Sequence, residues 1–155
     1  LYYENDTKIV MACKNANYSP VFFGVDGFDG ALEQEGVDVS MFEGFYYLTP
    51  FAYTATDDAT VSFVSKFNAL AGNNPNQFAA DAYDVVYAIY NALVEAGATA
   101  DMSAQDMGEL LCKTFQGGFT YSGLTGSNMT WNENGAVVKA PLAFQVKDGK
   151  LTAAE

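Results

Sequence analysis

The residues best suited to binding chemistry lie in a glycine-rich turn, Gly24-Val25-Asp26-Gly27-Phe28-Asp29-Gly30. The turn follows Val21-Phe22-Phe23, an apolar run of β-forming residues. Ligands of α/β sheets bind at the carboxyl ends of strands, and Asp26 occupies such a position between glycines that permit close approach. Its carboxylate could hold a cation there. An aspartate that only shapes the turn explains the same spacing, and both interpretations stay open.

Composition excludes several other kinds of chemistry. The chain has no histidine, so catalysis by serine or cysteine with an imidazole base is excluded, as are histidine-ligated metal sites. Its two cysteines, Cys13 and Cys112, have no metal-binding spacing; two buried thiols or a disulfide fit them. Seven basic and 19 acidic residues give a net charge of −12, which argues against nucleic acid and anionic membranes as partners. We expect no metal and no cofactor.

The elements that would position Asp26 are those of an α/β protein. Asn5-Asp6-Thr7 predicts the start of a helix that runs to about Asn15, ahead of the strand Val21-Phe22-Phe23. That strand is apolar on both faces, which is typical of a buried parallel strand. The remaining predictions are a strand over 44–49, a helix capped at Asp57-Asp58, a helix beginning near 77 and a helix capped at Ser103. An extended stretch over 136–146 and turns at 134–135 and 147–150 follow. No strand precedes the first helix, so we expect a piece of a longer protein.

A hydrolase is an alternative interpretation of the glycine-rich turn. Asp26-Gly27-Phe28-Asp29 followed by Glu33 resembles the DxxDxDxE signature of the chitinase family, in which the glutamate is the general acid. Ala31 replaces the middle aspartate of that signature. The chain is also shorter than the roughly 200 residues that the barrel of that family needs. A glycosidase-like hydrolase is therefore a remote alternative.

Over nearly its whole length the sequence resembles type I periplasmic binding proteins, in particular the leucine/isoleucine/valine-binding branch. The motifs that carry the resemblance occur in a consistent order: Tyr2-Tyr3-Glu4, Pro20 to Gly27, Gly44 to Pro50, Ala82 to Tyr87, Trp131 to Gly135 and Phe144 to Val146. The resemblance implies an α/β fold of two Rossmann-like lobes, of which this is the C-terminal part. Residues 1–49 would belong to the second lobe, residues 50–139 to the first, and residues 140–155 to the second again.

The same resemblance implies a binding site for an amino acid or a similar zwitterion. Tyr2 and Asp26 match the positions whose side chains hold the ligand's ammonium group, although many relatives have glutamate in place of Asp26. Phe28 would contact the ligand's side chain. Cys13 and Cys112 would lie in different lobes, which implies two free thiols.

At the level of function, the resemblance implies an extracytoplasmic protein, periplasmic or anchored as a lipoprotein, that delivers solute to an ABC permease without enzymatic activity. A ligand-sensing domain of a receptor or regulator is the alternative. The groups that hold the ligand's carboxylate would be encoded outside these 155 residues. We therefore expect the isolated chain to bind no amino acid tightly and to self-associate.

Overall fold

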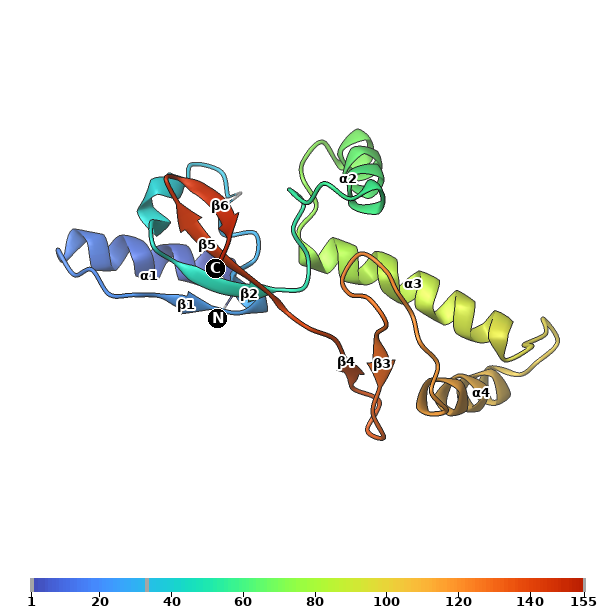
Figure 1. The fold of residues 1–155 in the computed structure, drawn as a ribbon. Coiled ribbons are helices and arrows are strands. Elements are labelled where there is room, and N and C mark those ends of the chain that lie inside the picture. Colours follow the sequence, from blue (N-terminus) through green and yellow to red (C-terminus); the bar gives the residue numbers. More distant parts are fainter. Residues whose placement is uncertain (1, 33, 155) are drawn as a thin grey trace. The chain divides into compact units, whose positions relative to one another are not determined.

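The protein consists of two compact units. A computed structural model describes residues 2–32 and 34–154 (Figure 1). Unit 1 extends to Ala52 and resumes at Pro141, and unit 2 spans Tyr53–Ala140. The predicted boundaries follow residues 49 and 139. In the structure they follow Ala52 and Ala140, which are three residues and one residue later. The assignment of these units to two lobes of a binding protein stays a prediction.

In its described residues, unit 1 is a four-stranded sheet with one long helix. Strands β1 (Phe23–Gly24) and β2 (Tyr46–Thr49) are parallel, and β5 (Leu142–Lys147) and β6 (Lys150–Ala153) continue the sheet antiparallel, in the order β1-β2-β5-β6. Helix α1 covers Tyr3–Asn15, and single turns of 3-10 helix cover Asp26–Phe28 and Val39–Phe42. The unit therefore joins segments that are about 90 residues apart in the chain.

The local sequence explains the ends of these elements. Asp148 and Gly149 both adopt positive φ, of 52° and 68°, as a tight two-residue hairpin turn between β5 and β6 requires. Helix α1 begins at Tyr3, two residues before the predicted cap at Asn5-Asp6-Thr7, and the Tyr2 side chain makes no capping hydrogen bond. The predicted cap residues thus lie inside the first turns of the helix.

The core of unit 1 is built mainly from aromatic rings. Phe28 stacks on Phe45 with ring centroids 3.9 Å apart and meets Phe42 and Tyr47 edge-on at 5.5 and 4.9 Å. Phe144 of β5 completes the group against Tyr47 at 6.1 Å. Offset and edge-on ring pairs add to the gain from burial itself. The segments before and after unit 2 in the sequence meet in this core.

Unit 2 consists of three helices and a small hairpin. Its elements are α2 (Asp58–Ala71), α3 (Gln77–Glu95), α4 (Ala104–Gln116), β3 (Thr130–Trp131) and β4 (Val137–Val138). The helices begin at side-chain caps, because Asp57, Asn76 and Ser103 accept backbone hydrogen bonds from Thr60, Ala79 and Asp106. The caps at Asp57 and Ser103 confirm the sequence prediction. None of the described helices is both long and apolar enough to cross a membrane.

Two groups of apolar side chains that the sequence pattern identifies are largely exposed in these 155 residues. The run Val21-Phe22-Phe23 was expected to be covered on both faces, yet β1 lies at the edge of the sheet and the Phe23 side chain is 79% exposed. Tyr83, Tyr87 and Tyr90 on α3 follow helical spacing, and each is at least 41% exposed. Tyr83 and Tyr87 nevertheless pack on each other, and Tyr83 packs on Phe63. Periodicity identifies apolar faces, and it does not show what covers them.

Candidate ligand-binding site

Asp26 lies where a ligand-binding carboxylate of an α/β sheet is expected. It begins the 3-10 turn Asp26–Phe28, two residues after the end of β1, and its side chain is exposed. The turn is closed by backbone hydrogen bonds from Phe28 N–H to Val25 O at 2.9 Å and from Asp29 N–H to Asp26 O at 3.1 Å. The carboxyl end of a parallel strand thus carries an accessible acidic group.

Packing explains the glycine that precedes this turn. A Cβ atom at Gly24 would lie 2.9 Å from Phe28 Cβ and 2.9 Å from Phe45 Cε1, closer than such atoms can approach. Gly24 therefore lets the backbone of β1 approach the aromatic core, and this contact holds the turn that carries Asp26 in place. The glycine at this position therefore has a structural cause.

Phe28 occupies the core side of the turn. Its side chain is 2% exposed, and its described ring contacts are with Phe42, Phe45 and Tyr47. These contacts give Phe28 a packing role that anchors the turn. A contact between Phe28 and a ligand side chain stays a prediction.

Tyr2 lies at the same end of unit 1 as the turn. It is the N-cap residue of α1, and its side chain is 67% exposed. Helix α1 and strand β1 run in opposite directions, so the start of the helix and the end of the strand lie at one end of the unit (Figure 1). A cavity of about 260 Å³ lies between helix α1 and strand β1. It is lined from α1 by Asp6, Ile9 and Val10, and from the strand side by Phe22, Phe23, Gly24, Val25, Phe28 and Phe45.

Asp6 is an acidic residue of this cavity that sequence reasoning assigned only to helix capping. Burial raises the pKa of the Asp6 carboxyl above its usual value. Nothing in the local sequence indicates this environment, because it arises from the packing of α1 beside β1. Glu33, the general acid of the hydrolase alternative, lies outside the described residues.

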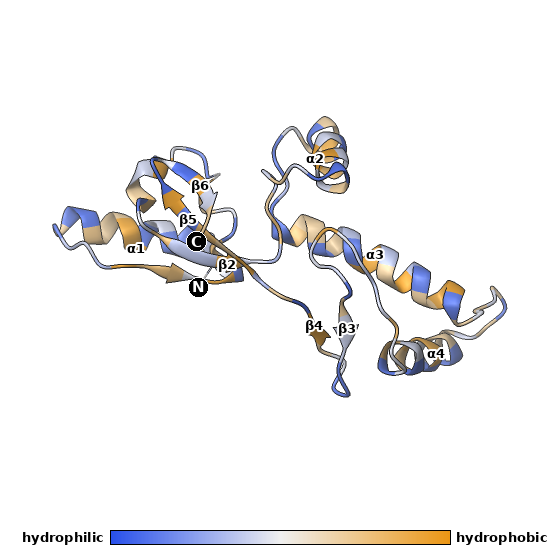
Figure 2. Cartoon of the chain, viewed as in Figure 1, coloured by the Kyte–Doolittle hydropathy of each residue, from blue (hydrophilic) through white to orange (hydrophobic). Residues whose placement is uncertain are grey.

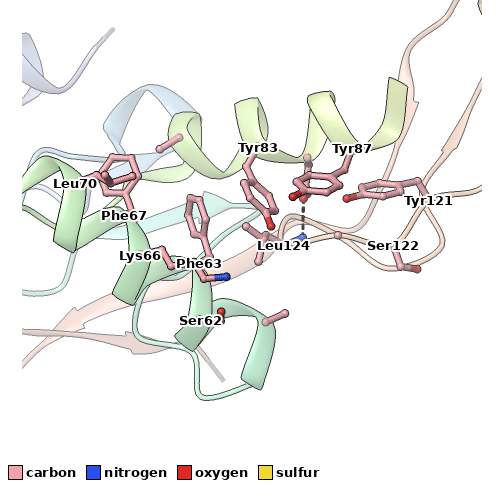
Figure 3. Close-up of a pocket in the computed structure, with 14 residues that line it drawn as sticks. Ser62, Phe63, Lys66, Phe67, Leu70, Tyr83, Tyr87, Tyr121, Ser122 and Leu124 are labelled. Carbon is pink, nitrogen blue, oxygen red and sulfur yellow. Dashed lines mark hydrogen bonds between the residues drawn. The ribbon is translucent and has the colours of Figure 1, made fainter. Parts of the chain in front are cut away.

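Unit 2 contains a larger, aromatic pocket of about 720 Å³. Figure 3 shows Phe63 of α2 beside Tyr83 and Tyr87 of α3, with Tyr121 beyond them. Ring centroids are 5.0 Å apart for Phe63 and Tyr83 and 4.7 Å for Tyr83 and Tyr87. A hydrogen bond with Tyr87 and burial raise the pKa of Tyr83, and burial raises the pKa of Tyr121 to about 12. Both phenols are therefore neutral at physiological pH.

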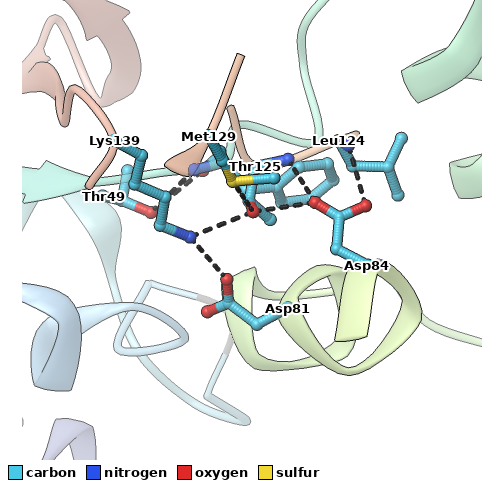
Figure 4. Close-up of polar contacts among 8 residues, drawn as sticks. Thr49, Asp81, Asp84, Leu124, Thr125, Met129 and Lys139 are labelled. Atoms are coloured by element: carbon cyan, nitrogen blue, oxygen red, sulfur yellow. Dashed lines mark hydrogen bonds and ion pairs between the residues drawn. The ribbon is translucent and has the colours of Figure 1, made fainter. Parts of the chain in front are cut away.

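A buried carboxylate joins α3 to the loop beside this pocket. Asp84, 4% exposed, accepts hydrogen bonds from Leu124 N–H at 2.9 Å and from Thr125 N–H and Oγ1 at 2.8 Å (Figure 4). A Cβ atom at Gly123 would overlap the Asp84 carboxylate, so this position has room only for glycine. Sequence reasoning missed these residues, because their partners are about 40 positions away.

Acidic side chains do not gather into a metal site in the described parts of the chain. No group of three or more histidine, cysteine, aspartate or glutamate side chains there is arranged to hold a metal ion. Cys13 lies in α1 of unit 1, and Cys112 lies in α4 of unit 2.

Comparison with known protein families now identifies the fold. The sequence profile described as periplasmic binding protein matches residues 3–150. The chain belongs to the periplasmic binding protein family. This assignment confirms the predicted α/β fold of type I. The hydrolase alternative depends on a barrel, which is a different fold. Among curated protein sequences, the comparison found no significant match.

Solved structures of this family align with almost the whole chain. One is LivJ of Streptococcus pneumoniae, a branched-chain amino acid transporter substrate-binding protein in complex with isoleucine. It is 24% identical to this chain with a TM-score of 0.77, and the alignment covers 100% of this chain and 42% of LivJ. LivK of Thermotoga maritima, a leucine-binding protein, is 20% identical with a TM-score of 0.73. The alignment covers 99% of this chain and 42% of LivK. A solute-binding protein of R. palustris in complex with benzoate is 17% identical with a TM-score of 0.72. The alignment covers 95% of this chain and 38% of that protein. The chain thus spans about two fifths of the length of these relatives.

Proposed function

We propose that this protein is part of an extracytoplasmic solute-binding component of an ABC importer, specific for an amino acid or a similar small zwitterion. The observation that carries the proposal is the exposed carboxylate of Asp26 at the carboxyl end of β1. It occurs in a fold shared with proteins whose solved complexes contain isoleucine and benzoate. The range of those ligands leaves the identity of the solute to experiment.

Asp26 and Tyr2 have the chemistry to bind an ammonium group. A carboxylate neutralises the cation, and the face of a tyrosine ring adds about 0.5–2 kcal/mol by a cation–π contact. Both side chains are exposed at the same end of unit 1, so they are accessible to a ligand. A second lobe would supply the groups that hold the ligand's carboxylate. A ligand that contacts both lobes favours their closed arrangement by its difference in affinity for the two states.

Replacement of Asp26 tests this proposal. In the protein encoded by the complete gene, Asp26→Asn should weaken amino-acid binding by about 2–5 kcal/mol, because the ligand's ammonium loses its counter-charge. Isothermal titration with leucine, isoleucine and valine measures the change. Asp58→Asn, the same chemical change at an exposed position of α2, is the matched control. Equal affinities for wild type and Asp26→Asn would leave Asp26 as a turn residue only.

We also propose that the isolated 155-residue chain self-associates. Among the described strands, β1 lies at the edge of its sheet, and the side chains of Val21, Phe23 and Val25 beside it are 61–79% exposed. Exposed apolar patches and open strand edges both favour association. Static light scattering should therefore report dimers or larger species, with no tight binding of amino acids. A compact monomer that binds leucine tightly would contradict this proposal.

A further inference from the structure

Asp26 and Phe28 belong to the same turn of 3-10 helix, Asp26 on its solvent side and Phe28 on its core side. The Asp26 side chain is exposed, whereas the Phe28 side chain is 2% exposed in the core of unit 1. Backbone hydrogen bonds from Phe28 N–H to Val25 O and from Ala31 N–H to Phe28 O, both 2.9 Å long, fix the chain on either side of Phe28. The position of the Phe28 backbone therefore determines where the turn presents Asp26.

The Phe28 side chain has little room to move. Its ring is stacked on Phe45 at 3.9 Å and meets Phe42 and Tyr47 edge-on at 5.5 and 4.9 Å. Protein interiors are close-packed and have low compressibility, so they transmit a displacement instead of absorbing it. A shift forced on Phe28 from the side of β1 would therefore reach the turn.

Gly24 sets the distance between β1 and this turn. A Cβ atom at position 24 would lie 2.9 Å from Phe28 Cβ and 3.2 Å from Phe28 Cγ. Because Phe28 Cβ is bonded directly to the backbone, no rotation of the Phe28 ring relieves the first of these contacts. Any side chain at position 24 would push the Phe28 backbone away from β1, and Asp26 with it.

We propose that Phe28 is a positioning residue: its packing against Gly24 and Phe45 fixes the place at which Asp26 presents its carboxylate to the ligand's ammonium group. Phe28 then acts through Asp26 without contacting the solute. This role rests on the proposed function, because it requires that Asp26 binds the ammonium group. A carboxylate that is already in place favours binding, since less freedom is lost when the ligand binds.

Gly24→Ala tests this role in the protein encoded by the complete gene, because it adds one methyl group beside Phe28 and leaves Asp26 intact. It should weaken the binding of leucine, isoleucine and valine by about tenfold, since a binding group has to be held within about 0.5 Å of its productive position. Gly108→Ala on α4 is the matched control, because an added Cβ there meets nothing within 4 Å. Isothermal titration should show wild-type affinity for Gly108→Ala.

A double-mutant cycle shows whether the effect passes through Asp26. In the Asp26→Asn background, Gly24→Ala should weaken binding by less than about twofold, because substitutions that act on the same contact are not additive. Equal losses in both backgrounds would contradict the proposal.

Phe28→Leu separates positioning from direct contact. Leucine keeps the Cβ atom and an apolar side chain but loses the ring contacts with Phe42, Phe45 and Tyr47. Its affinities for leucine, isoleucine and valine should fall by one common factor, so that the ratios between them stay as in wild type. A changed ratio would show that Phe28 contacts the solute's side chain, and it would overturn the positioning role.

Hydrogen exchange distinguishes a displaced turn from a lost fold. The amide of Val146 donates to Phe45 O within the sheet at 2.9 Å, and it should stay protected in Gly24→Ala and in Phe28→Leu. Loss of this protection in both variants would show that Phe28 stabilises unit 1 and does not position Asp26.

The Asp26→Asn variant tells failure of this role from failure of the proposed function. Wild-type affinity in Gly24→Ala together with weakened binding in Asp26→Asn would refute the positioning role alone. Wild-type affinity in Asp26→Asn would refute the proposed binding role of Asp26, and the positioning role with it.

Discussion

The two units of this protein stabilise their interiors in different ways. In unit 1, stacked and edge-on rings around Phe28 fill the space between the sheet and the turn that carries Asp26. In unit 2, a buried carboxylate, Asp84, binds the loop at Leu124 and Thr125 to α3. The gain from burying rings is non-directional, whereas each hydrogen bond to a buried carboxylate depends on the distance and angle of its donor. Substitutions should therefore affect the two units through different physical causes.

The units also differ in the surface they leave open. Helix α3 of unit 2 buries Ala80, Ala88 and Ala92 on one side, and Val86, Tyr90 and Val94 are more than 60% exposed on another (Figure 2). A helix with apolar residues on several faces is typical of a protein interior. In unit 1, the exposed apolar residues are concentrated beside the edge strand β1. Each unit thus has apolar surface that its own described residues do not cover.

The largest effect is expected in the aromatic core of unit 1. Phe28→Ala should reduce the free energy of unfolding of unit 1 by about 3–5 kcal/mol, because it removes a buried ring and leaves a cavity. Hydrogen exchange resolved by segment would show lost protection in β2 and β5, with α3 unchanged. Phe23→Ala, at a side chain that is 79% exposed, is the control and should change stability little. Equal losses in both units would show that the units unfold together.

A smaller effect is expected at the buried carboxylate of unit 2. Asp84→Asn should lower the free energy of unfolding of unit 2 by about 2–3 kcal/mol, because the amide keeps one acceptor and turns its NH₂ group toward a backbone donor. Urea denaturation followed by circular dichroism of the helices measures the loss. Gly123→Ala should act in the same direction, because its Cβ would overlap the carboxylate. Wild-type stability in both variants would show that this contact contributes little.

The smallest effect is expected at the cap of α2, and it depends on pH. The hydrogen bond from Thr60 N–H, 3.0 Å from Asp57 Oδ1, lowers the pKa of Asp57 below its usual value. A carboxyl whose pKa is lower in the folded state stabilises the fold above its unfolded pKa, and this contribution is lost as the pH falls through the folded value. Asp57→Ala should therefore cost about 1 kcal/mol at pH 7 and less below about pH 4.

Thermal unfolding at several pH values would test this dependence. Asp57→Asn is the informative control, because asparagine keeps the capping oxygen without a titratable group. The stability of Asp57→Asn should be near that of wild type at pH 7. Position 57 should then add no pH dependence to the stability, because asparagine does not titrate. A pH-independent cost for Asp57→Ala would show that the charge of the cap is irrelevant.

Much of the local structure could be predicted from short-range patterns. Asp57 and Ser103 were identified as helix caps because a cap depends on residues three positions away. The turn at Asp148 and Gly149 was predicted because few residues adopt positive φ without strain. The position of Asp26 after a strand was predicted on the same grounds, and the binding role of Asp26 remains to be tested.

The sequence by itself therefore determined the α/β character, the caps and turns, and, through its resemblance to a family, the type I binding-protein fold. Only the tertiary structure revealed that Gly24 accommodates Phe28 and Phe45, that Asp84 holds a loop 40 residues away, and that Lys139 reaches Asp81. The reason is physical. Caps and turns depend on neighbours within one helical turn, whereas a buried side chain's partners depend on how distant segments pack, which no local pattern encodes.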